Sequence, residues 1–106
     1  MIYKEPSDKP GKVRVSFELP SVIWADRVHL CGDFNDWSET AMPLHQSRDD
    51  GAWRVTIELD AGQCYQFRYL VNGTEWHNDW NADSYVPNIH GGDNSVVDTT
   101  LEEDDT

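Results

Sequence analysis

The chain has 106 residues, of which 38% are hydrophobic and 26% are charged, as in a single soluble globular domain. Its 20 acidic and 8 basic side chains give a formal net charge of -12, which would repel nucleic acid and anionic membrane surfaces. We therefore expect neither as a partner, whereas a neutral ligand carries no such penalty.

Composition divides the chain into three expected parts. Residues 1–12 are expected to form an N-terminal extension, residues 13–99 a β-domain, and residues 100–106 an acidic tail that stays solvated because its like charges lack apolar neighbours. Residues 1–12 contain no apolar run of signal-peptide length, and no later stretch is long enough to span a membrane. These features predict a cytoplasmic protein.

Two strands are predicted in the first third of the chain. Residues 12–19 alternate between apolar and polar side chains, which predicts a half-buried strand. Residues 24–31 form a second strand-like run, which ends in a turn over residues 32–37, where Gly, Asp and Asn are concentrated. Cys31 and Cys64 both lie in strand-like runs and are expected as free, buried thiols, with a disulfide between them as the alternative.

Three more strands and a hairpin are predicted further along. Residues 53–59 carry alternating apolar residues between two turns that contain glycine. Residues 64–71 also alternate, so that Arg68 shares a face with Gln66 and Leu70. Asn72-Gly73 then predicts a hairpin into residues 74–76, and a last short strand covers residues 95–99.

Short strands separated by turns, without helical periodicity, predict an all-β fold: an immunoglobulin-like antiparallel β-sandwich of the early-set type. One face of each strand would fill the core, where we expect Trp24, Trp53 and Tyr65 to pack. The outer sheet face would remain available to Arg68.

Two tryptophans stand at turns, where an indole ring is more easily presented to a ligand than buried. Trp37 closes the turn over residues 32–37, and Trp76 follows the Asn72-Gly73 hairpin signal. The alternative is that both rings cap the ends of the core.

A metal site is not expected. The spacing of His29, His45, His77 and His90 matches no compact ligand pattern, which favours structural or surface roles. The series Asp79, Asn81 and Asp83 resembles the start of a calcium loop but lacks the glycine and the further oxygen ligands that should follow. We expect neither a metal nor another cofactor.

Five motifs in fixed order resemble the family 48 carbohydrate-binding modules, which include the glycogen-binding domain of the AMP-activated protein kinase β subunit and the N-terminal modules of isoamylases and branching enzymes. The motifs are residues 28–37, Gly51-Ala52-Trp53, residues 65–73, Trp76 and residues 93–97. The resemblance covers most of the chain, and it is the ordered set that makes it specific.

The resemblance implies a β-sandwich that binds α-1,4-linked glucans. Trp37 and Trp76 match the tryptophans that stack on glucose rings, Arg68 matches a lysine of the preceding strand, and Asn94 belongs to a matched Asn-Asn pair. Asp93 stands at the first position of that pair, and Ile89 falls near a bulky apolar residue that pushes into the curve of the glucan.

The chain departs from the family pattern in three places. Arg68 replaces lysine, which keeps the charge but changes the donor geometry. Asp93 replaces asparagine, which loses a donor. Thr74-Glu75 lengthens the hairpin by one residue before Trp76.

Each polar assignment has a structural alternative. Arg68 could be an exposed strand residue paired with a nearby acid, and Asn94 could bond to the backbone of its own turn. Trp80 could extend the aromatic platform or cap it.

The function predicted from these residues is non-catalytic binding of glycogen, starch or maltooligosaccharides. One alternative is a module that docks on a kinase or on a glucan-active enzyme, since sandwich folds host unrelated functions. The other is a domain of a family 13 type glycoside hydrolase. We expect no catalytic residue, because the acids lie mostly in turns and the tail and a catalytic barrel does not fit in this length.

Overall fold

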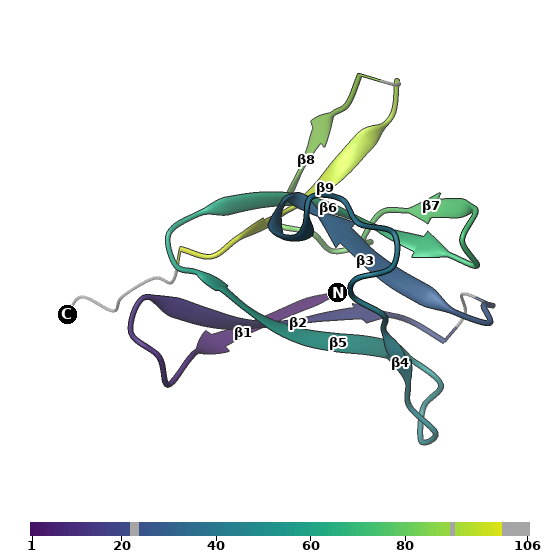
Figure 1. Cartoon of the computed structure of the whole chain (residues 1–106), viewed down its shortest axis with the longest axis horizontal. Helices are drawn as coiled ribbons and strands as arrows, with labels where there is room; N and C mark the ends of the chain where they lie inside the picture. The colour runs from purple at the N-terminus through teal and green to yellow at the C-terminus, as the bar shows by residue number, and fades with distance from the viewer. Residues whose placement is uncertain (22–23, 90, 101–106) are drawn as a thin grey trace.

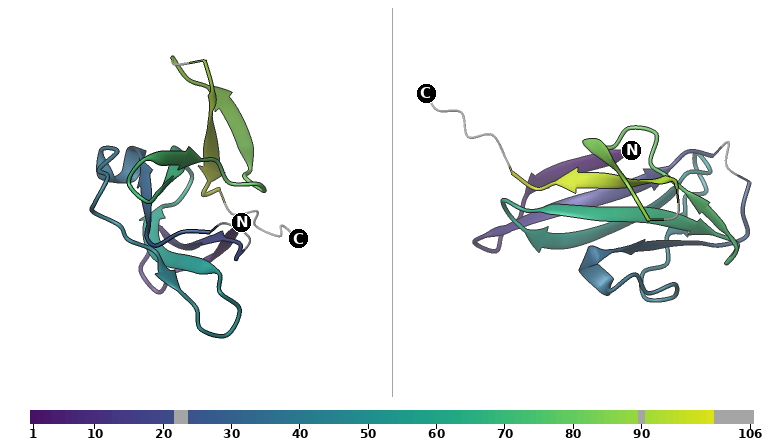
Figure 2. Two further views of the ribbon diagram at one scale, coloured as in Figure 1. Left: turned by 90° about the vertical axis from the view of Figure 1, so that its right-hand side faces the viewer. Right: turned by 90° about the horizontal axis from the view of Figure 1, so that it is seen from above.

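Two antiparallel β-sheets pack face to face in the computed structural model of the chain, which describes residues 1–21, 24–89 and 91–100 (Figure 1). The two layers are also seen when the molecule is turned (Figure 2). The expected class, an immunoglobulin-like β-sandwich, is confirmed.

The first sheet has the strand order β1-β2-β5-β4. Its strands are β1 (Ile2–Pro6), β2 (Lys12–Leu19), β5 (Trp53–Asp60) and β4 (His45–Gln46). The expected N-terminal extension thus contains an edge strand, since β1 pairs with β2. Most of the expected acidic tail, residues 101–106, lies outside the described residues.

The second sheet has the order β3-β6-β9-β8, and β7 also pairs with β6. Its strands are β3 (Val28–Gly32), β6 (Cys64–Val71), β7 (Glu75–His77), β8 (Ser84–Pro87) and β9 (Asp93–Asp98). A short 3-10 helix, η1 (Asp33–Asn35), follows β3. In Figure 1 the β8–β9 hairpin rises away from the body of the sandwich.

The core lies between the sheets, where the predicted alternation places it. Phe17 of β2 packs edge-on against Phe67 of β6, with ring centroids 4.9 Å apart, and Phe67 packs in turn against Tyr69. Trp53 is 7% exposed and joins this cluster, and Tyr65 packs against it, as predicted. Every second residue of β6 therefore points into the core and leaves Arg68 outside.

The prediction that Trp24 packs in the core is wrong, because this side chain is 79% exposed. The strand expected from residue 24 begins only at Val28. The backbone before it is held by Asn72, whose side-chain oxygen accepts hydrogen bonds from the N–H groups of Asp26 and Arg27. Trp24 thus lies ahead of the strand, where no sheet alternation directs its ring inward.

The two cysteines are free, but only Cys31 is buried; the prediction of burial is wrong for Cys64, which begins β6 and is exposed. Burial, with a smaller effect of the Glu39 charge, raises the pKa of Cys31 to about 11. We expect one fast-reacting thiol per native chain at about pH 8, and the second only after unfolding. Titration with dithionitrobenzoate measures this, and two equally fast native thiols would contradict it.

An ion pair in the turn before β5 predicts a pH effect on stability. The Arg54 guanidinium, 2.7 Å from the carboxylate, and the backbone N–H of Ala52 lower the pKa of Asp50 to about 2. The contribution is complete above the ordinary pKa of 3.8 and is lost as the pH falls towards about 2. We expect Asp50→Asn to lower the melting temperature slightly at about pH 6 and not at about pH 2. A difference that grows on acidification would contradict this.

No helix in the described ranges is long and apolar enough to cross a membrane.

Candidate functional site

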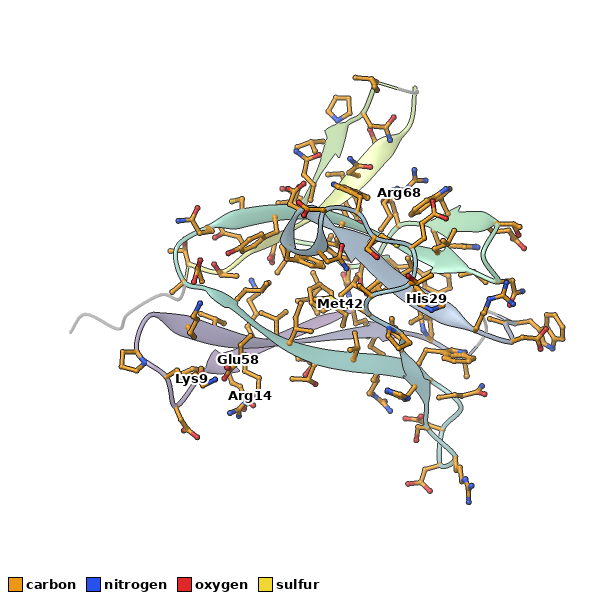
Figure 3. All side chains as sticks on the ribbon, in the orientation of Figure 1. Lys9, Arg14, His29, Met42, Glu58 and Arg68 are labelled. Carbon is orange, nitrogen blue, oxygen red and sulfur yellow. The ribbon has the colours of Figure 1, made fainter. Side chains whose placement is uncertain are left out.

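The outer face of the second sheet bears a hollow of about 730 Å³. The turn after β3 borders it, strands β6 and β7 form its floor, and the β8–β9 hairpin forms its far wall. Figure 3 shows Arg68 on this outer side of β6, below the raised hairpin. The residues that line the hollow are Trp37, Glu39, Gln66, Arg68, Trp76, Pro87, Asn88, Ile89 and Asn94.

Strand register explains why these side chains meet. Cys31 of β3 lies opposite Arg68 of β6, and Leu70 of β6 lies opposite Trp76 of β7. Ser95 lies opposite the inward-facing Phe67, so its neighbour Asn94 faces outward. Because side chains alternate along strands, Arg68, Trp76 and Asn94 share one face.

The turn that carries Trp37 has an unusual backbone. Asp36 and Trp37 have φ values of 55° and 58°, in the left-handed region that bulky side chains rarely occupy. Asn35 stabilises the turn, since its side chain accepts a hydrogen bond from the N–H of Gly32 and donates one to the carbonyl oxygen of Leu30. The chain thus leaves β3 in a sharp turn that brings the half-buried Trp37 ring to the rim of the hollow.

Arg68 lies against the second tryptophan. Its guanidinium carbon is 5.7 Å from the centroid of the Trp76 ring, within the range of a cation–π interaction. Trp76 is 38% exposed, so part of the indole remains accessible. Arg68 has no hydrogen-bond or ion-pair partner among the described residues, and its Nε is enclosed. Within the described residues, Arg68 therefore does not form the ion pair with a nearby acid that was the alternative to a binding role.

The isolation of Arg68 contrasts with most of the other basic side chains of this acidic chain. On the first sheet, Lys9 lies 3.3 Å from Glu58, and Figure 3 shows both on the side away from Arg68. Carboxylates also lie within ion-pair distance of four other basic side chains: Lys4, Lys12, Arg14 and Arg54. Most cations are thus neutralised locally, whereas the terminal NH2 groups of Arg68, unlike its buried Nε, have no hydrogen-bond partner among the described residues and can donate to a ligand.

A chain of amides runs from β6 to the hairpin. The Nδ2 of Asn94 donates to the Oε1 of Gln66 at 3.0 Å, and the Nδ2 of Asn88 donates to the Oδ1 of Asn94 at 3.3 Å. Among the described residues, the Asn94 side chain thus bonds to the side chains of Gln66 and Asn88 and not to the backbone of its own turn. The Nε2 of Gln66 has no partner among the described residues. Its N–H groups can therefore donate to a ligand.

The structure brings together all four principal residues of the sequence prediction, which are Trp37, Arg68, Trp76 and Asn94, and it adds Ile89, which is 94% exposed. Trp80 and Asp93 are not among the lining residues. Trp80 is 59% exposed, and the backbone oxygen of Asp93 accepts a hydrogen bond from Asn78. Whether these residues bind a ligand stays a prediction.

Sequence reasoning did not single out four lining residues, which are Glu39, Gln66, Pro87 and Asn88. Gln66 had a usable signal, since strand alternation puts it on the same face as Arg68. The other three lie outside the predicted strands, and only the folded path of the chain brings them to the hollow.

Among residues 1–21, 24–89 and 91–100, no group of three or more His, Cys, Asp or Glu side chains could hold a metal ion. His90 lies outside this range. The Asp79 carboxylate is already used, because it accepts hydrogen bonds from the Tyr69 hydroxyl at 2.7 Å and from the N–H of Asn81 at 2.7 Å. It anchors the connection after β7 to the buried Tyr69 of β6.

A β-sandwich that presents two indole rings in one hollow, beside donors that lack partners among the described residues, has the architecture of a binding module. The family described as carbohydrate-binding module 48 (isoamylase N-terminal domain) matches residues 10–86. The chain therefore belongs to this family and is a carbohydrate-binding module of the isoamylase N-terminal type.

The chain is similar to segments of 1,4-alpha-glucan branching enzymes GlgB. The enzyme of Chlamydia muridarum is 44% identical over 54 residues, which cover 47% of this chain and 7% of the enzyme. That of Chlamydia caviae is 35% identical over 74 residues (66% and 10%), and that of Butyrivibrio fibrisolvens is 32% identical over 82 residues (76% and 12%). The matched segments make up only 7%, 10% and 12% of the length of these three enzymes.

Proposed function

We propose that this chain binds α-1,4-glucans such as glycogen, starch and maltooligosaccharides, without catalysing a reaction on them. The observation that carries the proposal is the meeting of Trp37, Arg68 and Trp76 in one hollow. The family membership and the branching enzymes among the relatives support the same ligand class.

The hollow suits a neutral sugar chain. Flat indole faces cover the C–H faces of a pyranose ring, and each stacked ring contributes on the order of 1 kcal/mol beyond the burial of area. Arg68 donates to neighbouring hydroxyls, while Gln66 and Asn94 offer oriented amides. The net charge of -12 does not oppose a neutral ligand.

Binding by one such open site is expected to be weak, with a dissociation constant of about 1 mM to 1 μM, or about -4 to -8 kcal/mol. A glucan polymer offers many equivalent sites, which raises retention through avidity. The chain would then serve a catalytic partner by holding it on the polymer. Its likeness to a segment of branching enzymes supports a glucan-active enzyme in that role.

Titration with maltoheptaose while tryptophan fluorescence is recorded tests the proposal. We expect saturable quenching, retention on amylose or glycogen, and no comparable response to a β-1,4-linked glucose oligomer, whose chain does not curve. Unchanged fluorescence together with no retention would overturn the proposal.

Two further assays separate the alternatives. Incubation with starch and measurement of reducing ends should show no turnover, and turnover abolished by one Asp or Glu substitution would favour the hydrolase. A complex with a glucan-active enzyme or a kinase, formed without any affinity for sugar, would favour the docking module.

A further inference from the structure

The carboxylate of Asp33 links Trp37, on one side of the hollow, to strand β6 on its floor. Its Oδ1 accepts a hydrogen bond from the indole Nε1–H of Trp37 at 3.1 Å. Its Oδ2 accepts one from the backbone N–H of Gln66 on β6 at 2.8 Å. One side chain thus links the first tryptophan to the strand that carries the polar residues.

The bond to Gln66 completes the edge of the sheet where β3 ends. The last registered pair between β3 and β6 is Gly32 with Phe67. At the next position the chain turns into η1, so no backbone carbonyl of β3 meets the N–H of Gln66. The Asp33 carboxylate accepts this hydrogen bond instead, and it is thereby held against the strand.

The bond to Trp37 holds a ring that the hydrogen bonds of the turn backbone do not orient. A left-handed backbone is strained at a tryptophan and persists only where the surroundings impose it. The backbone contributes one bond, from the N–H of Trp37 to the oxygen of Gly32 at 2.9 Å. That bond fixes the Cα position and leaves the side-chain torsions free. The carboxylate of Asp33 is the polar contact that fixes the indole itself.

The same carboxylate determines what the ring can offer a ligand. The Nε1–H of Trp37 is satisfied within the protein, so the indole presents its apolar face and edge. Gln66, whose backbone holds the carboxylate, also receives the Asn94 amide on its side chain. The Trp37 ring, through Asp33, and the Asn94 amide are therefore both held by Gln66 of β6.

We infer that Asp33 is a positioning residue of the carbohydrate site, which holds the Trp37 ring at the angle that a sugar ring requires. It acts through Trp37 and is not itself among the residues that line the hollow. This inference rests on the proposed function, because it concerns the same site and the same ligand.

The test compares two substitutions that remove the same charge from the same turn. Asp33→Asn keeps one acceptor but turns a donor towards either Trp37 or Gln66, both of which are donors. Asp36→Asn is the matched control: Asp36 makes no side-chain hydrogen bond within the described residues, and Asn tolerates its left-handed backbone. Maltoheptaose affinity and the NMR signal of the Trp37 indole N–H are measured for both variants.

We expect Asp33→Asn to weaken maltoheptaose binding about tenfold and Asp36→Asn to change it less than about twofold. The Trp37 indole N–H should shift and exchange faster with solvent in Asp33→Asn only. In a Trp37→Phe background, which lacks the indole donor, Asp33→Asn should cost less than about twofold, because coupled residues are not additive. If Asp33→Asn does not fold, Asp33→Glu, which displaces the carboxylate by one methylene, takes its place.

Three outcomes would overturn the inference. The indole signal could stay unchanged in Asp33→Asn, the signal could shift while affinity stays at the wild-type value, or the loss of affinity could be equally large in the Trp37→Phe background. Failure of the wild-type chain to bind maltoheptaose would instead refute the proposed function, and the inference would fall with it.

Discussion

Trp37→Ala is expected to weaken maltoheptaose binding by about 30- to 150-fold, or about 2–3 kcal/mol, with the fold intact. The loss combines the stacked ring face with the apolar area that it covers on the sugar. The fold should survive because Trp37 lies in the turn after η1 and is not a member of the buried core cluster. Isothermal titration and the thermal unfolding midpoint measure the two effects.

Trp24→Ala is the matched control for this variant. Trp24 is 79% exposed and is not among the residues that line the hollow. Its removal deletes an equally large aromatic side chain and should leave affinity within about twofold. Equal losses in the two variants would indicate non-specific adsorption of the sugar, and an unchanged affinity in Trp37→Ala would remove the main support for the glucan site.

Gly32→Ala is expected to destabilise the fold by about 2–3 kcal/mol, because the site leaves no space for a methyl group. A Cβ at this position would lie 2.6 Å from the carbonyl oxygen of Gln66 and 2.9 Å from atoms of Phe34 and Phe67. The backbone of Gly32 is extended, with φ at -174°, so the requirement is for space and not for an unusual conformation. Two of the three contacts involve β6, which cannot move without disturbing the core.

The same substitution should also weaken glucan binding, since Gly32 accepts the backbone hydrogen bond of Trp37 and any shift of Gly32 moves the turn. Denaturant unfolding measures the stability and fluorescence titration the affinity. Gly92→Ala is the control: its backbone has no positive φ, and its added Cβ would meet Asn88 atoms at an ordinary 3.6 Å. A Gly32→Ala variant as stable as Gly92→Ala would show that β3 and β6 have room to separate at this point.

The second sheet illustrates how far local sequence patterns reach. The alternation over β6 correctly separates Phe67 and Tyr69, which are fully buried, from Arg68, which faces outward. The Asn72-Gly73 pair correctly predicts the hairpin into β7, and Asn72 indeed has a left-handed backbone, with φ at 56°. These features depend on residues close in the chain, so periodicity and turn chemistry are enough to predict them.

The burial of single residues was less predictable at the strand ends. Trp24 and Cys64 stand in strand-like runs and are nevertheless exposed, because each lies at or before the beginning of its strand. A ring or thiol is buried only where a neighbouring element covers it, and a local pattern does not contain that neighbour. Cys31 shows the converse: it faces outward opposite Arg68 yet is buried.

Residue types and their order along the chain were therefore enough to predict the β-sandwich, the family and the four principal candidates for glucan binding, Trp37, Arg68, Trp76 and Asn94. Contacts between distant segments were not predictable in this way. The hydrogen bond between Asp33 and Gln66 joins residues 33 positions apart in the sequence, and the one between Asn94 and Gln66 joins residues 28 positions apart. Such bonds depend on which strands become neighbours and in which register, and the packing of the whole core selects both.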